Sequence, residues 1–292
     1  MRFEGIMPAL VSPLNEDETI NTRALQDLIK YLLQKGADGF YVGGATGEGI
    51  VLKTEERMVL AETAVNAVNR LKPCIIHIAA ADFNEAILLA KHAEKIGADA
   101  VSAIPPLFFQ YDEDDVYNYY KRLAEAVGIP VMIYFNPAAG FHIDAQFAAR
   151  MFCIDNITAI KWTSSNYYEM IKLKDLTHGE MNIINGPDEM LLMGLNAGAD
   201  GGIGTTYNFM FDLIKEVYDN FKSNNKEAAQ AAQLRVDRII SVLLEYKTIP
   251  FTKVILEEMG FPVGNAVFPM KRYSELERQR IVSKMKNAGF QF

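Results

Sequence analysis

The chain has 292 residues, of which 50% are hydrophobic and 23% are charged, and its net charge is −8. This composition is typical of a globular protein, and the length suits one large α/β barrel with an appendage or two average domains. The negative charge argues against nucleic-acid binding, which needs a basic surface, but it permits an anionic substrate at a locally positive site.

The first residues contain no apolar segment with a small-residue cleavage site, and the longest apolar runs are too short to span a bilayer. The two cysteines, Cys74 and Cys153, belong to no short motif, which argues against a disulfide framework. We therefore expect a cytoplasmic protein that binds neither membranes nor nucleic acid.

Eight apolar segments alternate with predicted helices over residues 1–222. The predicted strands are Ile6–Val11, Gly39–Val42, Cys74–Ala79, Ala100–Ile104, Pro130–Tyr134, Ile157–Lys161, Met181–Ile184 and Asp200–Ile203. Predicted helices begin near Thr22, Thr54, Asn84, Asp112, Asp144, Asn166, Asp188 and Phe209, several at residues that favour a helix N-cap. This order predicts a (β/α)8 TIM barrel, although a doubly wound open sheet shows the same alternation.

A repeated motif supports this alternation. Gly36-Ala37-Asp38, Gly97-Ala98-Asp99 and Gly198-Ala199-Asp200 each follow an amphipathic stretch and precede an apolar run. Glycine favours the left-handed position that ends a helix, and the apolar run is typical of a buried parallel strand. Each copy therefore predicts a junction between a helix and a strand.

Residues 223–292 show a different pattern. Three helices are predicted, over Lys226–Glu245, Phe251–Met259 and Ser274–Asn287, with no strand between them. We therefore expect a catalytic barrel over residues 1–222 and a C-terminal three-helix extension over residues 223–292.

Catalytic residues of TIM barrels lie at the C-terminal ends of strands, and Lys161 ends one predicted strand. Burying a charged lysine is costly, so burial favours the neutral amine, which is a nucleophile that condenses with ketones. Tyr134 ends the neighbouring strand, about 4.8 Å away, where a phenol can relay protons. The alternatives are a lysine whose ammonium extends to solvent and an ordinary core tyrosine.

Polar and glycine-rich segments follow three other strands. The loops Gly43–Gly49 and Gly201–Thr206 can hold a carboxylate or a phosphate on backbone N–H groups, or can be simple tight turns. Asp188 and Glu189 can complement a helix dipole or accept hydrogen bonds from sugar hydroxyls. The four histidines have no metal-ligand spacing, so we predict no metal site.

Four segments together carry a family resemblance: Gly43-Gly44-Ala45-Thr46-Gly47-Glu48, Tyr134-Phe135-Asn136-Pro137, the Lys161 strand and Gly201-Gly202-Ile203-Gly204. Over nearly its whole length the chain resembles the N-acetylneuraminate lyase and dihydrodipicolinate synthase family of class I aldolases. The segments Gly186–Glu189 and Gly201–Asn208 are most similar to the sialic acid lyases of that family.

The resemblance implies a homotetrameric aldolase without cofactor or metal that cleaves N-acetylneuraminate reversibly to N-acetylmannosamine and pyruvate. It implies that Lys161 forms the Schiff base with the 2-keto acid and that Tyr134 relays protons. Thr46 and its loop, including Ala45, would hold the substrate carboxylate. The other implied substrate-binding residues face the hydroxylated part of the sugar acid: Thr163, Gly186, Asp188, Glu189, Gly204 and Thr205.

Three segments depart from the family pattern. Ala45 replaces a serine or threonine whose hydroxyl joins the proton relay. Phe108 and Phe109 occupy a loop that usually carries a tyrosine to the neighbouring subunit's site, and no arginine precedes Pro269. The alternatives are therefore a dihydrodipicolinate synthase or another pyruvate-dependent aldolase, a family member that binds the keto acid without turnover, and a phosphate-binding barrel enzyme.

Overall fold

The computed structural model describes residues 2–292 and contains one sheet of eight parallel strands, in the order β1-β8-β7-β6-β5-β4-β3-β2. β1 pairs with β8, and a parallel bridge between Ala9 and Tyr41 joins the end of β1 to β2, so the sheet closes into a barrel. The predicted TIM barrel is confirmed, and the open sheet is excluded. The strands are β1 (Gly5–Pro8), β2 (Phe40–Val42), β3 (Cys74–His77), β4 (Ala100–Ala103), β5 (Val131–Phe135), β6 (Ile157–Trp162), β7 (Asn182–Asn185) and β8 (Gly201–Gly204).

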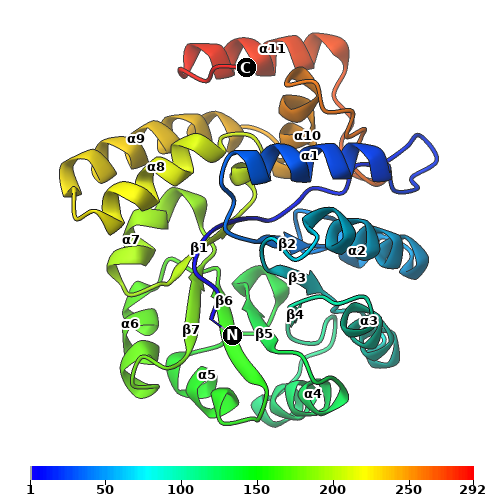
Figure 1. Cartoon of the computed structure of the whole chain (residues 1–292), viewed down its shortest axis with the longest axis vertical. Helices are drawn as coiled ribbons and strands as arrows, with labels where there is room; N and C mark the ends of the chain where they lie inside the picture. The colour runs from blue at the N-terminus through cyan, green and yellow to red at the C-terminus, as the bar shows by residue number, and fades with distance from the viewer. Residues whose placement is uncertain (1) are drawn as a thin grey trace.

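Eight helices surround the strands (Figure 1). They are α1 (Thr22–Gln34), α2 (Thr54–Val68), α3 (Phe83–Lys95), α4 (Glu113–Ala126), α5 (Ala145–Phe152), α6 (Tyr167–Leu176), α7 (Leu191–Asn196) and α8 (Phe211–Lys222). The predicted N-caps Asp112, Asp144 and Asn166 accept hydrogen bonds from backbone N–H groups in the first turn of their helices. The predicted seventh and eighth helices begin later than expected, because short 3-10 turns at Asp188–Met190 and Thr206–Asn208 precede them.

The Gly-Ala-Asp repeats form the junctions that the sequence predicts. Gly36, Gly97 and Gly198 have φ angles of 89°, 86° and 97°, a left-handed backbone that favours glycine. The aspartate of each repeat then accepts a hydrogen bond from a backbone N–H of a neighbouring strand. These bonds join Asp38 to Ile6, Asp99 to Cys74 and Asp200 to Ile183, at 2.9, 2.8 and 3.0 Å. The repeat therefore both ends a helix and ties its strand to the sheet.

Three helices follow the barrel: α9 (Lys226–Leu243), α10 (Thr248–Glu258) and α11 (Glu275–Asn287). α9 packs beside α8, and α11 lies at the far end of the molecule from the barrel, with α10 between (Figure 1). The middle of α10, from Pro250 to Leu256, is buried, and this stretch includes Lys253. Among the helices described, none is both long and apolar enough to cross a bilayer.

Candidate active site

The lysine and tyrosine that end β6 and β5 are neighbours in the sheet. Tyr134 is in register with Lys161, and both side chains are buried, at 4% and 5% exposure. The Lys161 Nζ lies 4.3 Å from the centre of the Tyr134 ring and 4.6 Å from that of Tyr41. No carboxylate in residues 2–292 lies within the 4.0 Å ion-pairing distance of this amine. Lys161 is therefore enclosed by aromatic rings and does not extend to solvent.

Two aromatic residues near Lys161 were not singled out by sequence reasoning. The rings of Tyr41 and His77 each lie 5.9 Å from the Tyr134 ring, and Tyr41 donates a hydrogen bond to Ser102. Neither His77 ring nitrogen has a hydrogen-bond partner among the described residues. Burial, reinforced by the charges of Arg57 and Lys161, lowers the pKa of His77 to about 3, so the imidazole is neutral at physiological pH.

The loops after β2 and β8 meet at a pair of threonines. The hydroxyls of Thr46 and Thr205 are 2.6 Å apart. Ser12, which follows β1, donates a hydrogen bond to the Gly47 carbonyl at 2.5 Å and fixes the same loop from its other side. Ala45 is exposed within this loop. The structure thus brings Thr46 and Thr205 together and leaves Ala45 open to a ligand.

The adjacent acidic residues after β7 have different environments. The Asp188 Oδ2 accepts hydrogen bonds from the backbone N–H and the hydroxyl of Thr206, at 2.8 and 2.7 Å, whereas Glu189 is exposed. Burial raises the pKa of Asp188 to about 6, against the opposing effect of the Thr206 hydrogen bonds. A Cβ at Gly204 would lie 2.0 Å from the Asp188 Oδ1, so only glycine fits at the end of β8. The Asp188 side chain is thus held in place by Thr206, whereas the Glu189 side chain is exposed to solvent.

Thr163 and Gly186 face each other across the ends of β6 and β7. The Gly186 N–H donates to the Trp162 carbonyl at 2.9 Å, and a Cβ at Gly186 would lie 2.0 Å from the Thr163 Oγ1. This hydroxyl has no partner among the described residues. A buried hydroxyl without a partner is costly, so a ligand that hydrogen-bonds Thr163 would remove that cost.

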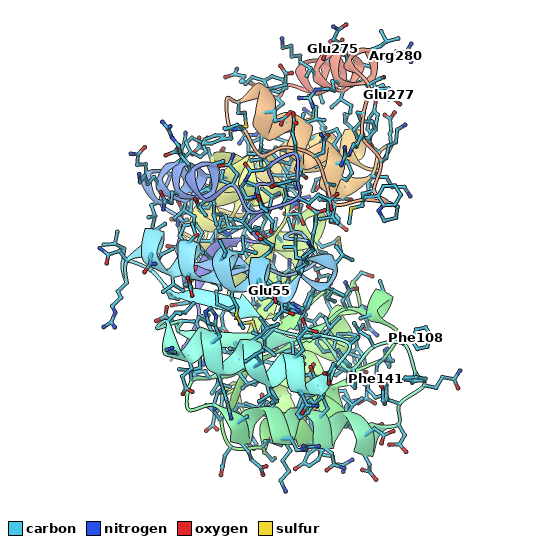
Figure 2. The ribbon with its side chains drawn as sticks, turned by 90° about the vertical axis from the view of Figure 1, so that its right-hand side faces the viewer. Glu55, Phe108, Phe141, Glu275, Glu277 and Arg280 are labelled. Atoms are coloured by element: carbon cyan, nitrogen blue, oxygen red, sulfur yellow. The ribbon has the colours of Figure 1, made fainter. Side chains whose placement is uncertain are left out.

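The loop after β4 exposes two aromatic side chains. Phe108 and Phe109 are 92% and 70% exposed, and their rings pack edge to face with centres 5.1 Å apart. Phe108 has a φ of 79°, which is unusual for a bulky residue. Figure 2 shows its ring at the outer edge of the molecule, pointing away from the ribbon. Within this single chain, Phe108 therefore contributes nothing to the site at Lys161.

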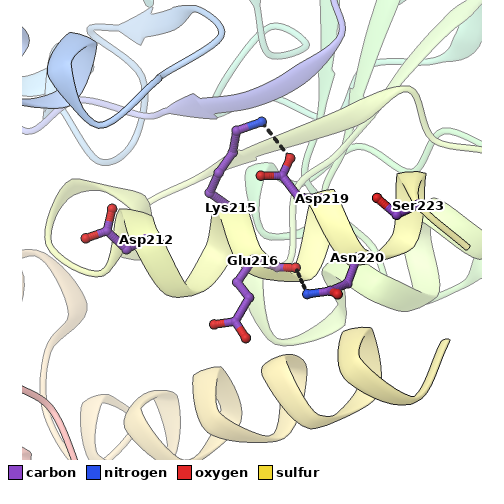
Figure 3. Close-up of a pocket in the computed structure, with 6 residues that line it drawn as sticks. All are labelled: Asp212, Lys215, Glu216, Asp219, Asn220 and Ser223. Atoms are coloured by element: carbon purple, nitrogen blue, oxygen red, sulfur yellow. Dashed lines mark hydrogen bonds and ion pairs between the residues drawn. The ribbon is translucent and has the colours of Figure 1, made fainter. Parts of the chain in front are cut away.

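A hollow of about 320 Å³ lies along α8, away from the strand ends (Figure 3). Its side chains already bond one another and neighbouring surface residues: Lys215 donates to Asp219 and Asn220 donates to the Glu216 carbonyl, both at 2.8 Å, and Asp212 accepts from Lys35 at 2.6 Å. No three His, Cys, Asp or Glu side chains in residues 2–292 are arranged to hold a metal ion. The candidate active site is therefore the set of side chains at the strand ends.

An eight-stranded parallel barrel with its polar side chains gathered at the strand ends defines a TIM-barrel enzyme. A model of the "Dihydrodipicolinate synthetase family" matches residues 2–288. An N-acetylneuraminate lyase of Rhizobium meliloti is 34% identical over 278 residues, which are 95% of this chain and 92% of that protein. The chain belongs to the dihydrodipicolinate synthetase family, and it is a carbon–carbon lyase of the aldolase type.

Solved structures agree with this assignment. The N-acetylneuraminate lyase of Proteus mirabilis superimposes with a TM-score of 0.95 at 30% identity, and the match covers 100% of both chains. A dihydrodipicolinate synthase of Bacillus anthracis has a TM-score of 0.93 at 26% identity, with 98% of each chain covered. Both enzyme types therefore share this fold.

Proposed function

We propose that this chain is a class I aldolase that cleaves N-acetylneuraminate reversibly to N-acetylmannosamine and pyruvate. The observation that carries the proposal is the Lys161 amine, which is buried between two aromatic rings and forms no ion pair with any residue from 2 to 292. Such an amine is a suitable nucleophile for a ketone. The names of several relatives, including the one from Rhizobium meliloti, support the choice of sugar acid.

In the proposed reaction the Lys161 amine attacks the C2 carbonyl, and water leaves to give a protonated imine. Removal of the C4 hydroxyl proton then drives cleavage of the C3–C4 bond, whose electron pair moves into the imine and forms an enamine. N-acetylmannosamine leaves, C3 takes up a proton, and hydrolysis releases pyruvate and the free amine. Tyr134, whose ring lies 4.3 Å from the Lys161 Nζ, is the proposed proton relay.

The substrate would lie across the strand ends. Thr46 and the backbone of its loop, including the exposed Ala45, would bind the carboxylate. Because Ala45 has no hydroxyl, this position cannot supply the hydrogen bond to Tyr134 that a serine or threonine would give. The hydroxylated part of the sugar acid would contact the remaining predicted residues, which are Thr163, Gly186, Asp188, Glu189, Gly204 and Thr205.

We further propose a homotetramer in the cytoplasm, with residues 1–222 as the catalytic barrel and 223–292 as the extension. Large apolar side chains are exposed on the outer helices, namely Tyr168 and Ile171 on α6 and Met193 on α7. Exposed apolar side chains of this kind support burial against another subunit. Sedimentation of the purified protein would measure the assembly directly.

Borohydride trapping tests the proposed chemistry. We expect the wild-type protein, after incubation with pyruvate and reduction, to gain the mass of one pyruvyl group per chain, at Lys161. Lys161→Ala should gain none, whereas the exposed-lysine control Lys226→Ala should react like the wild type. A wild-type protein that remains unmodified would rule out the Schiff base.

A dihydrodipicolinate synthase is the second candidate, because the Bacillus anthracis enzyme of that name has the same fold. A coupled assay for pyruvate released from N-acetylneuraminate separates the two. Release of pyruvate supports the lyase. Adduct formation without release would instead favour a synthase, another 2-keto-acid aldolase, or a protein that binds the keto acid without turnover.

A further inference from the structure

A buried ion pair joins the loop after β2 to the C-terminal helices. Glu48, in the Gly43–Gly49 loop, is 3% exposed, and Lys253, on α10, is 2% exposed. The Lys253 Nζ lies 2.7 Å from the Glu48 Oε1. Taking both charges out of water is costly, so a pair this deeply buried needs good geometry and further hydrogen bonds.

Both members of the pair have such hydrogen bonds, and these come from the segment between α10 and α11. The Glu48 Oε2 accepts a hydrogen bond from the Val267 N–H at 2.6 Å, and Lys253 donates to the Asn265 carbonyl at 2.9 Å. Glu48 also has a left-handed backbone, with a φ of 56°. The carboxylate is therefore held on two sides while its backbone adopts a conformation that is uncommon for glutamate.

The Gly43–Gly49 loop connects the Glu48–Lys253 pair to the candidate site. A Cβ at Gly49 would lie 1.8 Å from the Gly43 carbonyl oxygen, so the two ends of the loop are in close contact. Two residues before Glu48, Thr46 is held by Thr205 at 2.6 Å. The Gly43–Gly49 loop is thus held at Glu48 by Lys253, at Thr46 by Thr205 and at Gly47 by Ser12.

We propose that the Glu48–Lys253 pair positions the Gly43–Gly49 loop for binding the carboxylate of the keto acid, so that Lys253 is a positioning residue. The inference rests on the proposed function, in which this loop binds that carboxylate. Lys253 itself is placed to act through the loop and not on the substrate, because its buried amine contacts the Glu48 carboxylate and the Asn265 carbonyl. On this proposal the C-terminal helices contribute to substrate binding, because α10 supplies the lysine that holds the loop.

The test compares Lys253→Met with the double variant Glu48→Gln/Lys253→Met, which leaves no unpaired buried charge. Lys284→Met, which removes an exposed ion pair with Glu245, is the matched control. Each protein is titrated with pyruvate and with acetone, a ketone without a carboxylate, and the imine is trapped with borohydride. Hydrogen–deuterium exchange of the Gly43–Gly49 amides is measured in parallel.

We expect the concentration of pyruvate for half-maximal trapping to rise about tenfold in Lys253→Met and in the double variant, the effect of losing one hydrogen bond to a charged group. Half-maximal trapping by acetone should stay unchanged, and the loop amides should exchange faster. Lys284→Met should match the wild type in every measurement. This split between pyruvate and acetone is not expected from a purely structural pair.

Two results would overturn the inference: wild-type half-saturation by pyruvate in the double variant, or equal rises for pyruvate and acetone. If the wild-type protein forms no adduct at all, the proposed function fails. The loop exchange then decides the positioning role separately, because unchanged exchange of the Gly43–Gly49 amides in both variants would refute it.

Discussion

The neutral histidine beside the candidate nucleophile predicts a measurable dependence of stability on pH. In the fold, burial and two nearby cations hold the pKa of His77 at about 3, whereas an unfolded histidine titrates near pH 6.5. Between these values the unfolded chain binds a proton that the folded chain does not, so this residue lowers stability as the pH falls. Each pH unit corresponds to about 1.4 kcal/mol.

The variant His77→Phe removes this titration and keeps an aromatic ring next to Tyr134. Relative to the wild type, we expect the variant to gain about 2 kcal/mol of unfolding free energy between pH 6.5 and pH 4.5, because the unfolded histidine is half protonated at pH 6.5 and the full slope applies only at lower pH. Urea unfolding at fixed protein concentration, followed by the fluorescence of the single tryptophan, Trp162, measures that difference at each pH.

The difference between variant and wild type is the informative quantity, because other groups also titrate in this range. His142→Gln, which removes an exposed imidazole, is the control and should show a much smaller change with pH. A His77→Phe difference that stays constant from pH 7.5 to pH 4.5 would refute the reasoning, since it would mean that the buried ring accepts a proton as readily as the unfolded chain.

Two further predictions concern the residues after β7 and β8. Asp188 has the opposite sign to His77, because its pKa of about 6 exceeds the usual value of 3.8 and the folded chain binds the extra proton. Asp188→Asn should therefore lose about 2 kcal/mol of unfolding free energy relative to the wild type as the pH falls from 7 to 4, and a flat urea-unfolding difference would contradict this. Gly204→Ala, whose Cβ would lie 2.0 Å from the Asp188 Oδ1, should lower pyruvate release at least tenfold while circular dichroism stays native, whereas Gly128→Ala, which meets only the flexible end of Glu94 at 3.0 Å, should keep wild-type activity.

The barrel is predictable from sequence because its signals are local. A glycine that ends a helix and an aspartate two residues later have the same role in each repeat, as the bonds of Asp38 and Asp200 show. The adjacency of Tyr134 and Lys161 follows in the same way, because consecutive strands pair in a TIM barrel. Such features need only the order of elements along the chain.

The features that the sequence does not predict depend on contacts between segments that are far apart along the chain. The chemistry of His77 comes from the rings and cations packed around it, and nothing in its own segment indicates them. Glu48 was part of a recognised motif, but its partner Lys253 lies in a helix of the C-terminal extension. Asp188 and Glu189 are adjacent and chemically similar, so the sequence does not distinguish them. The 3-10 turn that contains them buries Asp188 and exposes Glu189.

The bond between Glu48 and Lys253 has a consequence for protein synthesis. Chains emerge from the ribosome N-terminus first, so Glu48 is made long before the lysine that neutralises it. Until α10 has been translated, the glutamate must stay hydrated or be buried alone at high cost. We therefore expect a polypeptide that stops before residue 253 to contain all eight strands but to lack an ordered Gly43–Gly49 loop, and we expect the enzyme to mature only after α10 has been made.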